Sequence, residues 1–285
     1  ASCRSGGATS TTRPTSHAEL EHLRRRHKAA AMKYFPQYAG LVSTPMLVVP
    51  STLYVVAAVL GSRMTTPGKP VCDVKNMMRL YNVAQIAVCG YMTLGLLPVI
   101  GWPNFFGIDS EFTEAGEWFV LVHYLSKFLD WFDTFFIIAK GNAKKQLSFL
   151  HVYHHSTIGV VWGILLASGN GNGTARYGAL INSVTHVFMY THYLWTSFKF
   201  KNPFKALLTK WQIAQFYSCF LHAVLVLSGV FVVETKIDKE LAWLQFCYHI
   251  TMVYLFTFQM AWIPKCYVPL DELDDAAPAS SKKRA

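Results

Sequence analysis

The sequence has few charged residues. Of its 285 residues, 15% are Asp, Glu, Lys or Arg, against about 25% in a typical soluble domain. Hydrophobic residues make up 52%, so the chain is neither a disordered protein nor an ordinary soluble domain. Each bilayer crossing needs about 20 apolar residues, and about six or seven crossings would use roughly half of the chain. The composition indicates a polytopic membrane protein with short loops and no separate soluble domain.

Several patterns that would indicate other functions are missing. The six cysteines include no CxxC pair, which disfavours a disulfide framework or a zinc site. One HxxHH motif occurs, without an HxxxH or a second HxxHH, whereas membrane di-iron desaturases and hydroxylases need several histidine clusters. The two halves of the chain show no convincing similarity, which disfavours a transporter or channel built from repeats.

Apolar segments recur with short polar breaks between them. We expect an all-α protein with about seven transmembrane helices, at residues 44–61, 77–100, 117–138, 149–167, 175–198, 211–232 and 241–263. The fourth segment is the weakest because three histidines lie inside it, and a shorter crossing or a partly buried helix is an alternative there. Residues 1–43 form a polar, basic N-terminal segment, 44–263 the transmembrane domain and 264–285 a polar tail.

The basic residues indicate an orientation. Lysines and arginines collect in the loops after the first, third and fifth segments, whereas the loop before Glu117 is acidic. Because basic loops stay cytoplasmic, the C-terminus is expected in the cytoplasm and the N-terminus in the lumen, although Arg24 to Arg26 conflict with the latter. Lys282 and Lys283 resemble a dilysine retrieval signal of endoplasmic reticulum proteins. Asn172-Gly-Thr174 is a glycosylation sequon in a luminal loop.

The strongest candidate for chemistry is His151-Val-Tyr-His154-His155. Residues three and four apart share one face of a helix, so His151 and His155 lie one turn apart with His154 beside them. Two uses fit three imidazoles on one face. They could ligate a metal, or a neutral imidazole could act as nucleophile or general base, since histidine exchanges protons near neutral pH.

Three other segments place polar side chains at membrane depth, where they are costly and therefore functional candidates. A stripe with helical spacing in the fifth segment contains Asn182, His186, Met189, Tyr190 and Tyr193. The third segment carries Lys127, Asp130, Asp133 and Thr134, and the sixth carries Gln212 and Gln215. The alternative for the last two groups is structural, because ion pairs and amides also hold membrane helices together.

Together these stretches resemble the ELO family of very-long-chain fatty acid elongases, which are membrane 3-ketoacyl-CoA synthases. The family motifs KxxExxDT, HxxHH, NxxxHxxMYxYY and TxxQxxQ occur in order between Lys127 and Gln215. The sequence around the HxxHH motif is similar to elongases of polyunsaturated chains in algae and related microbes. Two residues depart from the pattern. Asp130 replaces the usual Glu, and His192 replaces a Tyr, which bears on substrate choice if that position lines the acyl tunnel.

The resemblance implies a helical barrel around an acyl tunnel and a condensation reaction. An acyl-CoA, from the resemblance a polyunsaturated C18–C20 chain, and malonyl-CoA would give 3-ketoacyl-CoA, carbon dioxide and CoA. His154 would attack the thioester, and the enolate from malonyl-CoA would then take the acyl group. His186 would orient malonyl-CoA or stabilise the enolate, and Asn182 would hold His186.

The expected site comprises catalytic His151, His154, His155 and His186, with supporting Lys127, Asp130, Asp133, Thr134, Lys145, Asn182, Met189, Tyr190, His192, Tyr193, Gln212 and Gln215. Lys127 and Lys145 would contact the CoA phosphates, and the two carboxylates would position the histidines. We expect no metal, no other cofactor and no nucleic acid. The expected partners are the lipid bilayer, the reductase, dehydratase and second reductase of the elongation cycle, and a second copy in a homodimer. The alternative function is a membrane di-iron desaturase or hydroxylase.

Overall fold

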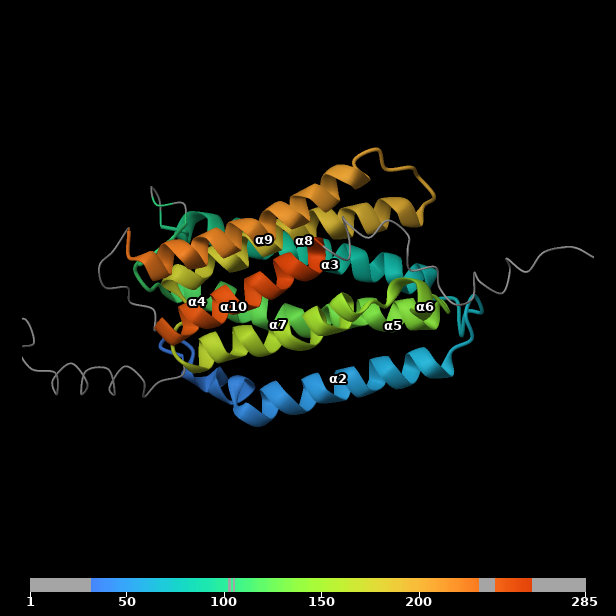
Figure 1. Ribbon diagram of the computed structural model, residues 1–285, viewed down its shortest axis with the longest axis horizontal. Helices are drawn as coiled ribbons and strands as arrows, with labels where there is room; N and C mark the ends of the chain where they lie inside the picture. Colours follow the sequence, from blue (N-terminus) through green and yellow to red (C-terminus); the bar gives the residue numbers. More distant parts are fainter. Residues whose placement is uncertain (1–31, 102–103, 105, 231–238, 258–285) are drawn as a thin grey trace, which may run out of the picture.

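Long helices run side by side along the molecule (Figure 1). A computed structural model describes residues 32–101, 104, 106–230 and 239–257, and this part contains helices and no strand. The long helices are α2 (Thr44–Met64), α3 (Lys75–Leu96), α4 (Glu114–Leu129), α5 (Trp131–Ala139), α7 (Phe149–Ala167), α8 (Arg176–Ser197), α9 (Lys205–Ser228) and α10 (Lys239–Phe256). The short helices are η1 (Pro36–Val42), η2 (Leu97–Val99), α6 (Ala143–Gln146) and η3 (Gly173–Ala175).

The all-α, polytopic membrane architecture is confirmed. Among the described residues, four helical stretches are long and apolar enough to cross a membrane: Thr44–Met64, Lys75–Val99, Phe149–Ala167 and Lys205–Ser228. Helix α2, at one edge of the bundle in Figure 1, exposes a row of large apolar side chains, namely Val48, Val49, Leu53, Val56 and Leu60. Such a surface is adapted to lipid, because a soluble protein rarely exposes so continuous an apolar patch.

The sixth segment begins earlier than expected, whereas the fourth has the expected bounds, 149–167. The sixth helix begins at Lys205, so Thr209 and Lys210 lie inside it. The fourth segment, expected to be weak, is a regular helix of 19 residues, which begins where the Ser148 hydroxyl accepts a bond from the His151 N–H. That N-cap satisfies one of the free donors of the first turn. The basic N-terminal stretch and the dilysine tail lie outside the described residues.

The third expected span, 117–138, is not one helix but two. Asp133 N bonds to Asp130 O instead of the Leu129 carbonyl that a regular helix would offer. The Leu129 carbonyl instead accepts the Tyr81 hydroxyl of α3 at 3.1 Å. A side chain from a neighbouring helix has therefore taken the acceptor that would keep the helix continuous, and α4 gives way to α5 at Asp130.

One end of the bundle, here called the basic end, gathers the positively charged loops. The loops after α2 and α5 are joined by backbone bonds, including Val71 N to Ala139 O at 2.8 Å. Arg79 near the start of α3 donates to Ser197 O at the end of α8 at 2.9 Å. The lysines and arginines of this end are Arg63, Lys69, Lys75, Arg79, Lys140, Lys144, Lys145, Lys199, Lys201 and Lys205.

The opposite, acidic end is held together by buried charged side chains. The Glu117 carboxylate accepts three successive backbone N–H groups, from Lys33, Tyr34 and Phe35, at 2.8–3.0 Å. The guanidinium of buried Arg176 donates to the backbone carbonyls of Val99, Glu111 and Gly173. The Glu117 bonds fasten the first described residues to α4, and the Arg176 bonds fasten the α3–α4 connection to α8.

The sequon residue Asn172 also belongs to the acidic end. Only 2% of it is exposed, and its amide donates to Thr113 O at 2.7 Å while its carbonyl oxygen accepts Gly173 N at 2.9 Å. Attachment of a glycan requires a free, exposed amide nitrogen. In the folded protein, Asn172 is therefore not available for glycosylation.

Close helix contacts depend on glycine in this bundle. A β-carbon at Gly163 of α7 would lie 2.1 Å from Leu47 of α2 and 3.1 Å from Tyr124 of α4. Because membrane helices associate by packing rather than by the hydrophobic effect, small residues at such contacts let the backbones approach. Gly163 thereby holds α7, the helix that carries the histidine motif, against its neighbours.

Candidate active site

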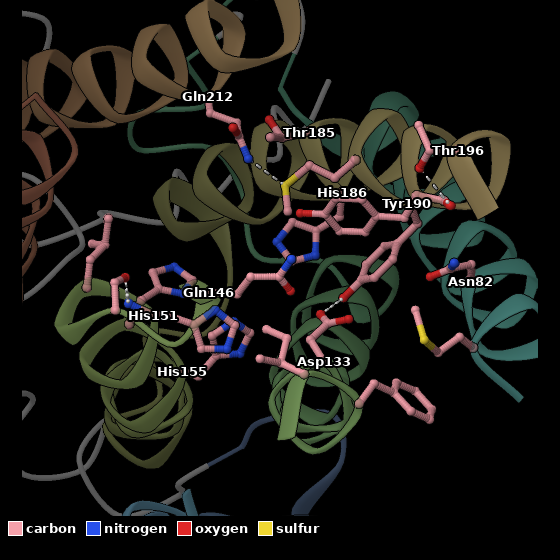
Figure 2. Close-up of a pocket in the computed structure, with 18 of the residues that line it drawn as sticks. Asn82, Asp133, Gln146, His151, His155, Thr185, His186, Tyr190, Thr196 and Gln212 are labelled. Atoms are coloured by element: carbon pink, nitrogen blue, oxygen red, sulfur yellow. Dashed lines mark hydrogen bonds between the residues drawn. The ribbon is translucent and has the colours of Figure 1, made fainter. Parts of the chain in front are cut away.

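Most of the residues singled out in the sequence meet around a cavity of about 710 Å³ (Figure 2). Because Lys140 and Lys205 also line it, we infer that the cavity opens toward the basic end. Its walls include His151, His154, His155, Asp133, Asn182, His186, Met189, Tyr190, Tyr193, Gln212 and Gln215. They come from α5, α7, α8 and α9, which are distant in the sequence. Lys140 and Lys205 from the basic end also line the cavity.

His151 and His155 stack on one face of α7, with ring centres 4.3 Å apart. The Nε2 atom of His151 lies 2.7 Å from the Thr134 hydroxyl, which is itself 2.7 Å from the Tyr54 hydroxyl. This chain of hydroxyls from α5 and α2 fixes the orientation of the His151 ring. A role for Thr134 in orienting a histidine follows from the geometry, whereas its sequence motif indicated only that it belongs to the site.

His154 lies at the boundary between two cavities. A second, narrower cavity of about 60 Å³ follows the first along α7, α8 and α9, and the two share His154, Asn182, Gln215 and Phe216 in their walls. The second cavity then runs past Ile158, Trp162 and Leu165 toward the acidic end. Unlike His151, His154 has no hydrogen-bond partner among the described side chains, so its ring nitrogens are available to a ligand.

A buried ion pair lies behind the histidines. Lys127 Nζ is 3.2 Å from Asp130 Oδ2 and donates to Asn182 Oδ1 at 2.8 Å. Both charged residues are at most 2% exposed. A buried ion pair is tolerated only when its remaining donors and acceptors are also satisfied, and Asn182 supplies part of that satisfaction. Asn182 therefore holds Lys127 rather than His186.

The carboxylate of Asp130 has further partners on α3 and α8. Its Oδ1 accepts Gln85 Nε2 at 2.9 Å and lies 3.1 Å from the Tyr190 hydroxyl. The same hydroxyl is 2.7 Å from Asp133 Oδ2. Tyr81 adds its hydroxyl to this network, 2.8 Å from Gln85 Nε2 and 3.2 Å from Tyr190. The Asp130 carboxylate thus connects three helices behind the wall of the cavity, which Tyr81, Asp133 and Tyr190 line.

His186 faces the cavity from the middle of α8 (Figure 2). Its Nδ1 lies 3.8 Å from Asp130 Oδ1, which is within ion-pair range but too long for a hydrogen bond. One helical turn further along, Met189 Sδ accepts Gln212 Nε2 from α9 at 2.9 Å. The amide of Gln212 therefore joins α8 to α9, in keeping with its structural interpretation, while Gln215 borders both cavities.

Five expected site residues lie outside the cavity wall, namely Lys127, Asp130, Thr134, Lys145 and His192. Asp130 and Thr134 lie behind the wall, where they contact residues that line it. Lys127 is buried against Asp130, so it does not fit the expected contact with CoA phosphates. Lys145 is exposed on α6 and is not among the lining residues. His192 contacts Asn202 at 2.6 Å in the loop after α8 and likewise lies outside the wall of either cavity, so its departure from the family pattern affects a loop contact instead of a tunnel.

The structure adds cavity residues that the sequence reasoning missed. Tyr81 and Asn82 of α3 line the cavity, as do Lys140 and Lys205, and Gln85 supports Asp130 from behind. The signal that could have identified the α3 group is a set of polar residues, Tyr81, Asn82 and Gln85, on one face of an apolar segment.

The other chemistry that fits three clustered histidines is metal binding. Within the described ranges, no three His, Cys, Asp or Glu side chains are arranged to hold one metal ion.

Comparison with known proteins agrees with this geometry. Residues 41–260 match the model of the ELO family, described as the GNS1/SUR4 family. The chain belongs to the ELO family.

Its curated relatives are named as elongases. Fatty acid elongase 5 of Leishmania major is 43% identical over 223 residues, which cover 78% of this chain and 87% of the relative. Fatty acid elongase 4 of Trypanosoma brucei brucei is 42% identical over 227 residues, 78% of this chain and 86% of the relative. Very long chain fatty acid elongase 5 of Mus musculus is 30% identical over 220 residues, which cover 73% of this chain and 70% of the relative. The expected family and enzyme class, a membrane 3-ketoacyl-CoA synthase, are confirmed.

The buried ion pair of this ELO protein gives a testable prediction. Replacing Lys127 by Met leaves Asp130 as a buried, unpaired carboxylate, which we expect to lower the free energy of unfolding by about 3–5 kcal/mol. In the double variant Lys127→Met/Asp130→Leu the unpaired charge is gone, so we expect most of the stability to return without activity. Thermal unfolding of detergent-purified protein measures both effects.

The matched control is Lys145→Met, which changes an exposed lysine and is expected to leave the unfolding temperature unchanged. If the single variant Lys127→Met were as stable as the parent protein, the ion pair would not organise the site.

Proposed function

We propose that this elongase condenses a polyunsaturated long-chain acyl-CoA with malonyl-CoA by way of an acyl group carried on His154, without a metal or organic cofactor. The observation that supports this best is the position of His154 at the junction of two cavities. One cavity is wide, polar and open toward the basic end, and the other is narrow and leads into the helix bundle. A thioester with its CoA in the first and its acyl chain in the second would place the reacting carbonyl beside His154.

The proposed chemistry proceeds in two steps. An unprotonated nitrogen of His154 attacks the thioester carbonyl, the carbon–sulfur bond breaks, and CoA leaves with the proton of the other ring nitrogen. Malonyl-CoA then enters, loses carbon dioxide and forms an enolate whose carbon attacks the acyl carbonyl. The carbon–nitrogen bond breaks, and the imidazole recovers a proton from solvent. Dividing the reaction in this way lets one cavity accept two CoA esters in turn.

The neighbouring side chains have separate tasks in this proposal. His186 lies across the cavity from the HxxHH motif (Figure 2) and is placed to orient malonyl-CoA or to donate to the enolate oxygen. Thr134 holds His151, which packs on His155 and so keeps the histidine face rigid. Preorganised donors of this kind lower the cost of developing charge. Asp130 acts on His186 through the electrostatic field of the ion pair.

The narrow cavity is proposed to hold the acyl chain. From His154 to Leu165, α7 advances about 16 Å, and the wall over this distance contains Trp162, Gly178 and Cys219. Polar and aromatic groups also line it, including Thr174, His222, Gln245, Tyr248 and His249. The polyunsaturated chain is proposed from the resemblance of the sequence around the HxxHH motif to elongases of such chains.

The basic end is proposed to face the cytoplasm of an endoplasmic reticulum membrane. Basic loops are retained on the cytoplasmic side, and the C-terminal lysines resemble a retrieval signal that works from that side. Lys140 and Lys205 then lie where CoA phosphates enter the cavity. We further propose that the product passes to a separate reductase, dehydratase and second reductase, and that the protein forms a homodimer.

The nucleophile can be tested directly. We expect His154→Ala to abolish condensation, measured by mass spectrometry as 3-ketoacyl-CoA formed from malonyl-CoA and a panel of saturated and polyunsaturated acyl-CoAs. Incubation of the parent protein with acyl-CoA alone should add the acyl mass to the peptide that contains His154. A chelator should not change the rate. Since His192 lies outside the cavity, His192→Ala is the matched control and should keep its activity. Turnover by His154→Ala, or loss of activity with the chelator together with bound iron, would contradict the proposal.

The lysines at the cavity mouth should control affinity for CoA esters. Lys140→Ala and Lys205→Ala each remove a cation that attracts phosphate, and we expect each to raise KM for malonyl-CoA about threefold to tenfold at low salt, with a smaller effect at high salt. Lys145→Ala, at an exposed position beyond the wall, should change KM little. A larger effect of Lys145→Ala than of the other two would move the CoA site to α6.

Product length should depend on Gly178. A β-carbon there would meet Trp162 Cη2 at 3.4 Å and Cζ2 at 3.5 Å, which is ordinary contact, so Gly178→Val narrows the second cavity without a backbone clash. We expect the longest accepted acyl chain to shorten by at least one two-carbon unit. Gly90→Val adds the same atoms on α3, where no atom lies within 4 Å, and should leave the products unchanged. Identical product profiles for the two variants would show that the acyl chain lies elsewhere.

A further inference from the structure

Helix α3 contributes a buried amide that the described structure leaves without a partner. Asn82 is 3% exposed, and its Nδ2 has no hydrogen-bond partner among the described residues. Buried donors are nearly always paired in native proteins, and an exception requires an explanation. Asn82 also lines the large cavity, so a ligand in that cavity could supply the missing acceptor.

The polar groups near Asn82 are already engaged. The Ser197 hydroxyl donates to Leu194 O at 2.7 Å, and the Thr196 hydroxyl lies 3.0 Å from His192 O. The Tyr81 hydroxyl donates to Leu129 O. These side chains direct their protons to backbone carbonyls, which leaves the Asn82 amide as the uncommitted donor on this side of the cavity within the described ranges.

The position of Asn82 indicates which part of a substrate passes it. Arg79, about one helical turn earlier on α3, bonds to Ser197 at the basic end, so Asn82 lies about one turn inside the cavity mouth. In Figure 2, Asn82 lies on the opposite side of Tyr190 and Asp133 from His151 and His155. The narrow cavity begins at His154, on the other side of this group. Asn82 therefore faces the CoA portion of a bound ester and not its acyl tail.

We propose that Asn82 is a substrate-binding residue that donates a hydrogen bond to an oxygen of the CoA ester, either a pantetheine amide carbonyl or the malonyl carboxylate. This inference rests on the proposed function, and it assigns a binding role to a residue outside all four sequence motifs. A binding site that donates a hydrogen bond to a polar group of its ligand loses affinity when either the donor or the acceptor is removed. The remaining group is then buried without a hydrogen-bond partner.

The test compares stability with affinity in the full-length, detergent-purified protein. Leu has the same branching as Asn, and its extra volume can extend into the cavity that Asn82 lines. Because Leu removes the unpaired donor, we expect Asn82→Leu to be at least as thermostable as the parent protein in the absence of ligand. Its Kd for malonyl-CoA, from ligand-induced shifts in unfolding temperature, should rise about tenfold, as expected for one lost hydrogen bond. An equal rise in the Kd for free CoA would identify a pantetheine carbonyl as the acceptor, whereas a rise for malonyl-CoA alone would identify the carboxylate. Asn76→Leu, at an exposed position on the same helix, is the matched control.

Opposite results would overturn the inference. Unchanged affinities for both probes would show that Asn82 does not contact the ester. A fall in stability in both Asn82→Leu and the smaller Asn82→Ala would assign it a structural role. Because binding is measured without turnover, a parent protein that binds CoA esters but forms no 3-ketoacyl-CoA would refute the proposed function and leave the role of Asn82 in binding intact.

Discussion

The ion pair between Lys127 and Asp130 is the interaction on which the site depends. A full charge of each sign is buried in a bundle that exposes apolar side chains to lipid, and this is stable only if both groups are fully hydrogen-bonded. The required partners come from different helices. Gln85 of α3 and Tyr190 of α8 reach Asp130, and Asn182 of α8 reaches Lys127. Satisfying this one ion pair therefore fixes the relative positions of α3, α4, α5 and α8, of which α3, α5 and α8 contribute to the cavity wall.

Asp130, which stands where the family motif has Glu, belongs to the same network. The shorter side chain lies at the break between α4 and α5, where the turn brings its carboxylate close to Lys127. Tyr81 opens that break by taking the Leu129 carbonyl. Helix geometry and charge placement are thus coupled, because the hydroxyl that interrupts the helix also accepts a hydrogen bond from the Gln85 amide, which in turn bonds to the Asp130 carboxylate.

Hydropathy and motif spacing predicted much of this protein, and their failures have a common cause. Six of the seven expected segments each correspond to one long helix and the third to α4 and α5, since lipid imposes length and apolarity on each crossing separately. Four stretches of the described residues are long and apolar enough to cross a membrane. The break at Asp130 could not be predicted, because it depends on Tyr81 from another helix. The burial of Lys127 and the exclusion of His192 from the cavity are likewise tertiary effects. Spacing along one helix identifies a shared face but not what that face meets.

The acidic end has a consequence for how products leave. The side chains of Glu117 and Arg176 hold backbone segments across this end by hydrogen bonds. Within the described residues, the narrow cavity therefore leads toward an end of the bundle that these segments cover. In the binding mode proposed above, an acyl chain that enters tail first is therefore withdrawn head first. The lengthened chain is then released at the face of the molecule where the substrate entered.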